Sequence, residues 1–189
     1  MGEKSLLYHL ARASFLLEVN TMTNPDLILR KQLLIEQSRN VSFNLLNLNC
    51  WPLWNKVANR ILSEQQGELQ PEQRFDLHRI MAQQLIEDLW QVSQIKSSKN
   101  PSFVELRLTW VGQRINGRTS ALAIQRLVIE ITVLETENGG IEISAWWEIS
   151  KLGRLLRFGR RLARAIVSQI FDDLVNHGTI EYQQVSENA

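Results

Sequence analysis

The chain has 189 residues, which is enough for one domain with a sizeable hydrophobic core. Its charged fraction of 22% and hydrophobic fraction of 44% are ordinary for globular proteins, and its net charge of +1 argues against a protein that coats nucleic acid with its whole surface. Cys50 is the only cysteine, which excludes an intrachain disulfide and a multi-cysteine metal site. We therefore expect a soluble protein of a reducing, cytoplasmic compartment.

The N-terminal stretch contains a short apolar segment that is a poor signal peptide. His9 and Arg12 interrupt its apolar core. The sequence leaves open whether Met1 or Met22 is the natural start.

Apolar residues in the first half recur at steps of three and four, which is the spacing of one helical face. This spacing predicts helices over residues 25–39 and 52–62 and a longer helix over residues 71–95. The apolar positions of the longest helix are Phe75, Leu77, Ile80, Met81, Leu85, Leu89 and Val92. We therefore interpret residues 1–96 as a helical portion.

The polar run at 96–101 is the clearest break in composition, and we interpret it as a connector between the two halves. Beyond it the apolar period changes to two, which predicts half-buried strands. These strands are expected at 104–110, 127–133 and 141–149, with a hairpin turn at Asn138-Gly139-Gly140 and a further edge strand at 180–185.

Six basic residues and no acidic residue lie in the segment from 151 to 164. They are Lys151, Arg154, Arg157, Arg160, Arg161 and Arg164. Four of the arginines recur at steps of three, four and three, so they line one face of a helix. The opposite face carries Leu155, Phe158, Leu162, Ile166 and Ile170, which we expect to pack on the sheet.

The fold predicted from these patterns is α+β, with N-terminal helices, an antiparallel sheet of three to four strands, and a long C-terminal helix packed on the sheet. Residues 97–189 would form the sheet and the arginine-rich helix. Together with residues 1–96 they would make one compact domain.

The arginine-rich face predicts a binding site for an acidic partner, because the planar guanidinium fork matches carboxylates and phosphates. A solvated helix face whose arginines pair with Glu142 or Glu148 explains the same pattern. Among acidic partners we favour a protein over nucleic acid or an anionic membrane, because the net charge is near zero and no nucleic-acid motif is present.

Three further residues are assigned to the same partner-binding surface. Arg114 and Arg118 flank the turn signal Asn116-Gly117, and they widen the basic surface if this turn lies near the helix. A polar hairpin turn is the plainer explanation. Trp146 is an aromatic residue on a polar strand face, where it would stack on a base, lie at a lipid interface, or be buried by the N-terminal helices.

The sequence contains no catalytic or cofactor motif that we recognise. Its histidines, His9, His78 and His177, lack the spacing of a metal site. We therefore expect a non-enzymatic binding or assembly protein without a cofactor. The alternative is a small-ligand or catalytic pocket between sheet and helices, which pocket geometry around Trp146 would reveal.

Overall fold

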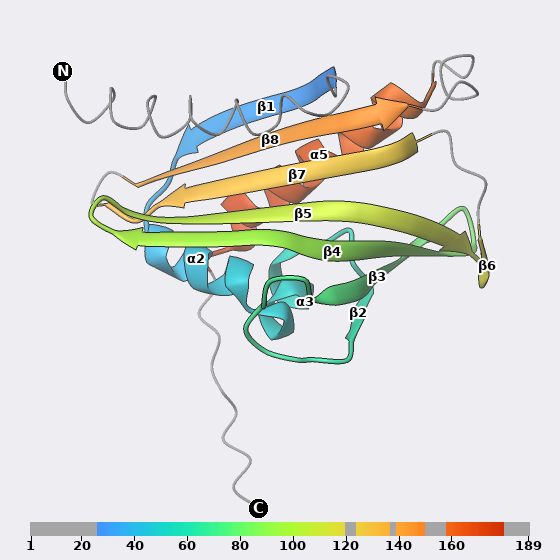
Figure 1. The fold of residues 1–189 in the computed structure, drawn as a ribbon, viewed down its shortest axis with the longest axis horizontal. Coiled ribbons are helices and arrows are strands. Elements are labelled where there is room, and N and C mark those ends of the chain that lie inside the picture. Colours follow the sequence, from blue (N-terminus) through green and yellow to red (C-terminus); the bar gives the residue numbers. More distant parts are fainter. Residues whose placement is uncertain (1–25, 120–123, 137–138, 150–157, 180–189) are drawn as a thin grey trace, which may run out of the picture.

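The computed structural model describes residues 26–119, 124–136, 139–149 and 158–179. Its strands form one antiparallel sheet of eight strands in the order β1-β8-β7-β5-β4-β3-β2, with β6 paired to β5 (Figure 1). The strands are β1 (Asp26–Leu34), β2 (Arg60–Ser63), β3 (Arg74–Met81), β4 (Gln84–Lys99), β5 (Ser102–Ile115), β6 (Arg118–Thr119), β7 (Ile124–Leu134) and β8 (Gly140–Ile149).

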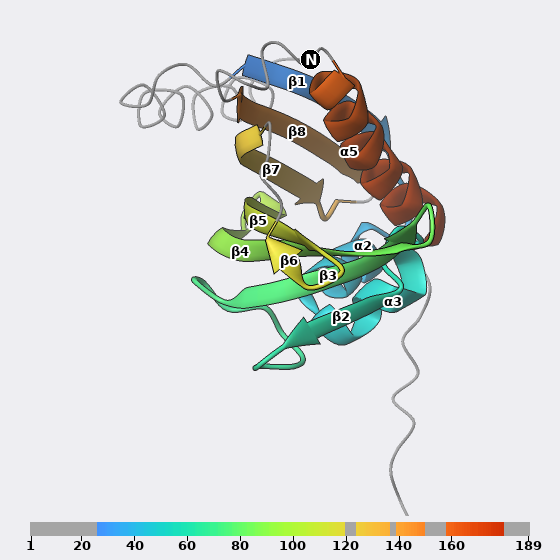
Figure 2. The same cartoon turned by 90° about the vertical axis from the view of Figure 1, so that its right-hand side faces the viewer.

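The helices pack on one side of this sheet, and Figure 2 shows the sheet curving around that side. We call this side the concave face and the other side the convex face. Three short helices lie between β1 and β2 in the chain, and the long helix follows β8. They are α2 (Ser38–Leu46), the 3₁₀ helix η1 (Leu48–Cys50), α3 (Trp51–Trp54) and α5 (Phe158–His177).

Strict alternation of side chains determines which residues of the sheet enter the core. In β8 the residues Ile141, Ile143, Ala145 and Trp147 are at most 2% exposed and belong to the hydrophobic core. The register places Ile143 between Ile131 of β7 and β1. A shift of one residue would move this whole set to the convex face, so burial fixes the register.

The C-terminal helix is attached to the sheet by apolar contacts and by two acidic side chains. Its buried residues Ala163, Val167, Ile170, Phe171 and Leu174 join the core. Lys31 Nζ of β1 donates to Asp172 Oδ1 at 2.8 Å, and the backbone N of Lys56 donates to Asp173 Oδ2 at 2.8 Å. The helix is therefore fastened to the first strand and to the chain that follows α3.

Gly178 ends α5 because no larger residue fits there. Its backbone N donates to the carbonyl oxygen of Leu174 at 2.8 Å, and a Cβ at this position would lie only 2.3 Å from that oxygen. A glycine is the common solution at this position after a helix.

The predicted architecture is wrong in its first half and in the size of its sheet. Residues 71–95 form the hairpin of β3 and β4 instead of a helix, and residues 26–34 form β1. The helix expected at 52–62 is limited to α3. The expected connector at 96–101 comprises the end of β4, which continues to Lys99, and the turn between β4 and β5. The sheet therefore runs through both halves, and the first half is not a helical portion.

The physical reason for this error lies in the side chains of β3 and β4. Their concave face carries the polar residues Arg79 and Asp88, whereas Ile80 and Leu85 are exposed. Apolar residues thus recur every three or four positions within a strand pair, and they imitate an amphipathic helix.

The predicted strands at 104–110, 127–133 and 141–149 lie within β5, β7 and β8. Within the described ranges, no helix has both the length and the apolarity that crossing a membrane requires.

Candidate functional site

A row of large side chains crosses the concave face. Trp90 of β4 pairs with Trp110 of β5, Trp110 pairs with Leu127 of β7, and Leu127 pairs with Trp147 of β8. All four are at most 6% exposed. Three indole rings are therefore brought into one line, on the same side of the sheet as α5.

Two of these indoles have buried N–H groups without an acceptor. The Nε1 atoms of Trp90 and Trp147 make no hydrogen bond with any described residue, whereas the Nε1 atoms of Trp51 and Trp54 donate to backbone carbonyl oxygens at 2.9 and 3.2 Å. A buried donor left without a partner costs about 1–3 kcal/mol. Native proteins contain few such groups, and a bound molecule is one way of satisfying them.

A buried polar cluster borders this row at Trp110. Asp88 accepts hydrogen bonds from Arg79 Nε at 2.7 Å, from Gln113 Nε2 at 2.6 Å and from Trp110 Nε1 at 3.3 Å. The side chains of Arg79 and Asp88 are each 9% exposed. The carboxylate is therefore well compensated, since it accepts from one cation and two neutral donors.

The guanidinium of Arg79 makes fewer hydrogen bonds than the carboxylate of Asp88 accepts. Among the described residues, it donates through Nε to Asp88, and its Nη1 has only the thioether of Met81 at 3.7 Å. A thioether is a weak acceptor. Terminal N–H groups of Arg79 thus remain available at the border of the apolar row.

The convex face carries ion pairs between neighbouring strands. Arg107 Nη2 lies 2.7 Å from Glu130 Oε2, and Lys96 Nζ lies 3.2 Å from Glu105 Oε1. Burial raises the pKa of Glu130, and the hydrogen bond from Arg107 opposes that rise. Trp146 lies on this face, half-buried between Leu27 and Val128. It therefore points away from α5, and a pocket between sheet and helix would be lined by Trp147 instead.

Only some of the predicted arginine surface falls on described residues. Arg161 and Arg164 are exposed on α5. The residues Lys151, Arg154 and Arg157 lie outside the described ranges, and Arg160 lies in α5 with an undescribed side chain.

The turn between β5 and β6, which Arg114 and Arg118 flank, lies at the end of the sheet from which α5 starts (Figure 1). Arg114 is 44% exposed in its side chain, with Nη1 4.0 Å from Asp76 Oδ2, and Arg118 is exposed. The turn between them has positive φ at Asn116 (49°) and Gly117 (76°), as its sequence suggests. The hairpin and the start of α5 therefore lie at the same end of the sheet, although α5 packs on β1 and β8 whereas β6 pairs with β5.

Where the chain is described, the other reactive residue types form no recognisable catalytic group. Cys50 is buried, and burial raises the pKa of its thiol. His78 Nε2 lies 3.7 Å from Glu87 Oε1 on the convex face. The described part of the chain holds no cluster of three or more side chains suited to a metal ion.

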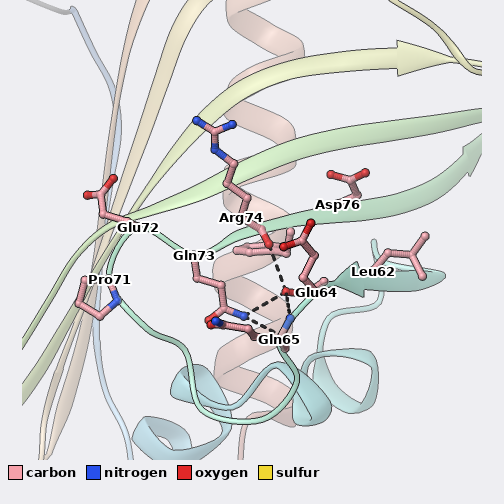
Figure 3. A pocket seen from close by; sticks show the side chains of 10 residues that line it. Leu62, Glu64, Gln65, Pro71, Glu72, Gln73, Arg74 and Asp76 are labelled. Carbon is pink, nitrogen blue, oxygen red and sulfur yellow. Dashed lines mark hydrogen bonds between the residues drawn. The ribbon is translucent and has the colours of Figure 1, made fainter.

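An open hollow of about 750 Å³ lies beside β2 and the start of β3 (Figure 3). Its wall is tied together by Gln73, whose Nε2 donates to Ser63 Oγ at 3.1 Å and to the carbonyl oxygen of Gln65 at 2.9 Å. Three acids and one base line it: Glu64, Glu72, Asp76 and Arg74. Gln73 uses its hydrogen bonds within the wall, and the hollow is open to solvent. We therefore regard it as an ordinary depression of the protein surface.

Comparison with known proteins identifies the fold. No family model matches the sequence, and no curated protein matches it either. Among solved structures, norcoclaurine synthase from Thalictrum flavum aligns with a TM-score of 0.60 at 8% identity, covering 83% of this chain and 96% of its own. A START superfamily protein from Mycobacterium smegmatis aligns with a TM-score of 0.56 at 8% identity, covering 78% of this chain and 94% of its own.

A hypothetical protein from Helicobacter pylori aligns equally well, with a TM-score of 0.56 at 14% identity over 79% of this chain and 86% of its own. The fold is a helix-grip fold of the START/Bet v 1 type. At these identities the likeness extends to the helix-grip architecture and no further.

Sequence reasoning missed the residues that matter most at the concave face of this helix-grip fold. The segment predicted as a helix contains Trp90, Asp88 and Arg79. Their common position on the concave face of a sheet could therefore not be predicted. The alternation of Ile86, Asp88, Trp90 and Val92 was the available signal for β4.

Proposed function

We propose that this protein binds a small, mainly apolar molecule with hydrogen-bond acceptors, held between the concave face of the sheet and α5. The observation that carries the proposal is the pair of buried Nε1–H groups of Trp90 and Trp147 that have no acceptor among the described residues. Because three strand spacings separate the two indoles, two separate oxygens of a bound molecule, carbonyl or ether, would satisfy them.

The chemistry of the face supports a ligand of this kind. Small-molecule sites are mostly apolar and aromatic, with a few convergent polar groups that fix the orientation. The indole row supplies flat apolar surface, and Arg79 supplies a polar group at its border. One structural neighbour, norcoclaurine synthase, was solved in complex with a transition-state analogue, so this fold accommodates a small organic molecule in that protein.

The matched pair Trp147 and Trp146 tests the proposal, because they are neighbours on opposite faces of β8. The probe is 1-anilinonaphthalene-8-sulfonate, followed by its fluorescence during titration of the native protein. Trp147→Phe keeps an aromatic ring and removes the donor, so we expect about fivefold weaker binding. Trp146→Phe should bind like the wild type. Absence of saturable binding, or equal effects of both substitutions, would exclude the concave face.

A second candidate function is the binding of an acidic, cytoplasmic protein partner through the arginine-rich helix. It is supported by Arg161 and Arg164, which are exposed and make no ion pair with any described residue. Replacing both by glutamate should abolish retention on heparin, a polyanionic mimic, with an unchanged circular dichroism spectrum. Arg39→Glu, an exposed position on α2, is the control and should leave retention unchanged. Unchanged retention of the Arg161/Arg164 variant would remove the arginine face from consideration.

A further inference from the structure

The hairpin of β3 and β4 carries exposed apolar side chains at its tip. Its two-residue turn is formed by Ala82 (φ 49°) and Gln83 (φ 63°), directly after β3. Next to the turn, Ile80 is 67% exposed, Met81 is 44% exposed and Leu85 is 38% exposed. Ile80 and Leu85 are paired across the hairpin. The tip is therefore a small apolar projection at one end of the sheet.

The neighbouring hairpin of β5 and β6 is attached to this tip. The backbone N of Asn116 donates to the carbonyl oxygen of Leu85 at 2.9 Å, and the backbone N of Leu85 donates to Asn116 Oδ1 at 3.0 Å. Arg118 follows directly after this second turn and is exposed. The two tips thus form one unit, in which apolar and basic side chains lie side by side.

A cross-strand row on the convex face adds two more arginines next to the tip. Arg60 pairs with His78, His78 with Glu87, and Glu87 with Arg114. The cations of this row are its outer members: Arg114 is 44% exposed in its side chain, whereas Glu87 is only 15% exposed. The surface presented around Ile80 is therefore apolar in the centre and positively charged at its border.

We infer that this end of the protein docks on an anionic lipid bilayer. Ile80, Met81 and Leu85 enter the interface between headgroups and acyl chains, and Arg60, Arg114 and Arg118 contact lipid phosphates. Basic residues around a bulky apolar group are the combination that holds proteins at anionic membrane surfaces.

The shape of this surface favours a bilayer over the other anionic partners. A stable protein interface buries about 800 Å² on each partner, more than three side chains at a hairpin tip provide. Nucleic acid would use the arginines and leave the aliphatic side chains exposed. A bilayer uses both, because its phosphates lie above an apolar layer that is reached after about 5–10 Å.

Co-sedimentation with vesicles tests this inference on the full-length protein. We expect sedimentation with phosphatidylcholine vesicles that contain phosphatidylserine, and much less with phosphatidylcholine alone. The double variant Ile80→Ser/Met81→Ser should partition at least about tenfold more weakly, because it removes most of the buried apolar surface. Its matched control is Leu33→Ser/Leu34→Ser, which removes side chains 47% and 76% exposed at the opposite end of the sheet and should change nothing.

Charge variants separate insertion from simple attraction. Arg114→Gln and Arg118→Gln should each weaken partitioning by about fivefold. Arg39→Gln on α2, at the opposite end, should have no effect. Failure to sediment with anionic vesicles would overturn the inference. The inference would also be overturned if the arginine variants lost vesicle binding while the Ile80→Ser/Met81→Ser variant kept it. That result would indicate a polyanion such as nucleic acid as the partner. Thermal melts confirm that each variant is folded.

Discussion

Removal of Asp88 should destabilise the protein more than removal of its partner Arg79. In Asp88→Ala the guanidinium of Arg79 stays in a site where its side chain is 9% exposed, with the Met81 thioether as its remaining contact. An uncompensated buried charge costs about 3–5 kcal/mol. The indole of Trp110 and the amide of Gln113 would also lose their common acceptor.

Arg79→Met is the milder change, because Asp88 keeps hydrogen bonds from Trp110 and Gln113. We expect it to cost about 2 kcal/mol, within the range for a hydrogen bond to a charged group. The double variant Arg79→Met/Asp88→Leu removes both charges and fills the space with apolar side chains. It should lie within about 1 kcal/mol of the wild type, because such replacements of buried pairs are often neutral.

Urea denaturation followed by circular dichroism gives the free energy of unfolding for all four proteins and completes the double-mutant cycle. The reasoning requires a large coupling between the two positions. A cost below about 1 kcal/mol for Asp88→Ala, or additive effects in the double variant, would show that water reaches the pair and that the cluster is not a buried polar site.

Three other predictions concern the core, the convex face and the thiol. Replacing Ile143, which has no exposed surface, by alanine should lower the free energy of unfolding by about 3–5 kcal/mol in urea melts. Glu142→Ala should lower it by about 1 kcal/mol, since the side chain of its partner Arg30 is 47% exposed. Because burial raises the pKa of Glu130 in the folded state, its protonated form favours folding, so stability should fall as pH rises through the range just above the usual glutamate pKa. Glu130→Gln should flatten this dependence in urea melts taken across that range, and an unchanged slope would contradict burial as its cause. Cys50 is buried with a raised thiol pKa, so it should react with a disulfide reagent such as Ellman's far more slowly in the native protein than in urea; equal rates would place it at the surface.

The parts of the fold that were predictable are those where one face of a strand is apolar and the other polar. In β8 the alternation of Ile141, Glu142, Ile143 and Ser144 left little choice of structure, and Gly178 marked the end of α5. These are local signals, which survive without knowledge of what packs on the strand.

The hairpin of β3 and β4 was not predictable in this way, because two of its features reverse the usual pattern. Arg79 and Asp88 place a charge pair inside, and Ile80 and Leu85 place apolar side chains outside. Its turn at Ala82 and Gln83 also has positive φ without glycine or asparagine, so the usual sequence mark of a hairpin is missing. The two sites that we propose both involve this hairpin, and the proposed functions would explain the departure from the folding pattern.

The candidate site could also be predicted only in part from the sequence. Trp110 and Trp147 were recognised as members of strands, but only the register across four strands places them in line with Trp90. Such alignment depends on bulges and hairpin lengths, which one sequence does not specify.

The pairing of β1 with β8 has a consequence for how the protein is made. The ion pair between Lys31 and Asp172 joins residues 141 positions apart, and β1 lies at the edge of the sheet with β8 as its neighbour. On the ribosome β1 therefore emerges long before its neighbour β8, which is the last of the described strands in the chain. Pairing of the two strands must wait until β8 has been synthesised, and refolding should be slow because these contacts are so distant in sequence. In the interval β1 exposes an unpaired strand edge, which gives chaperones a reason to hold the nascent chain.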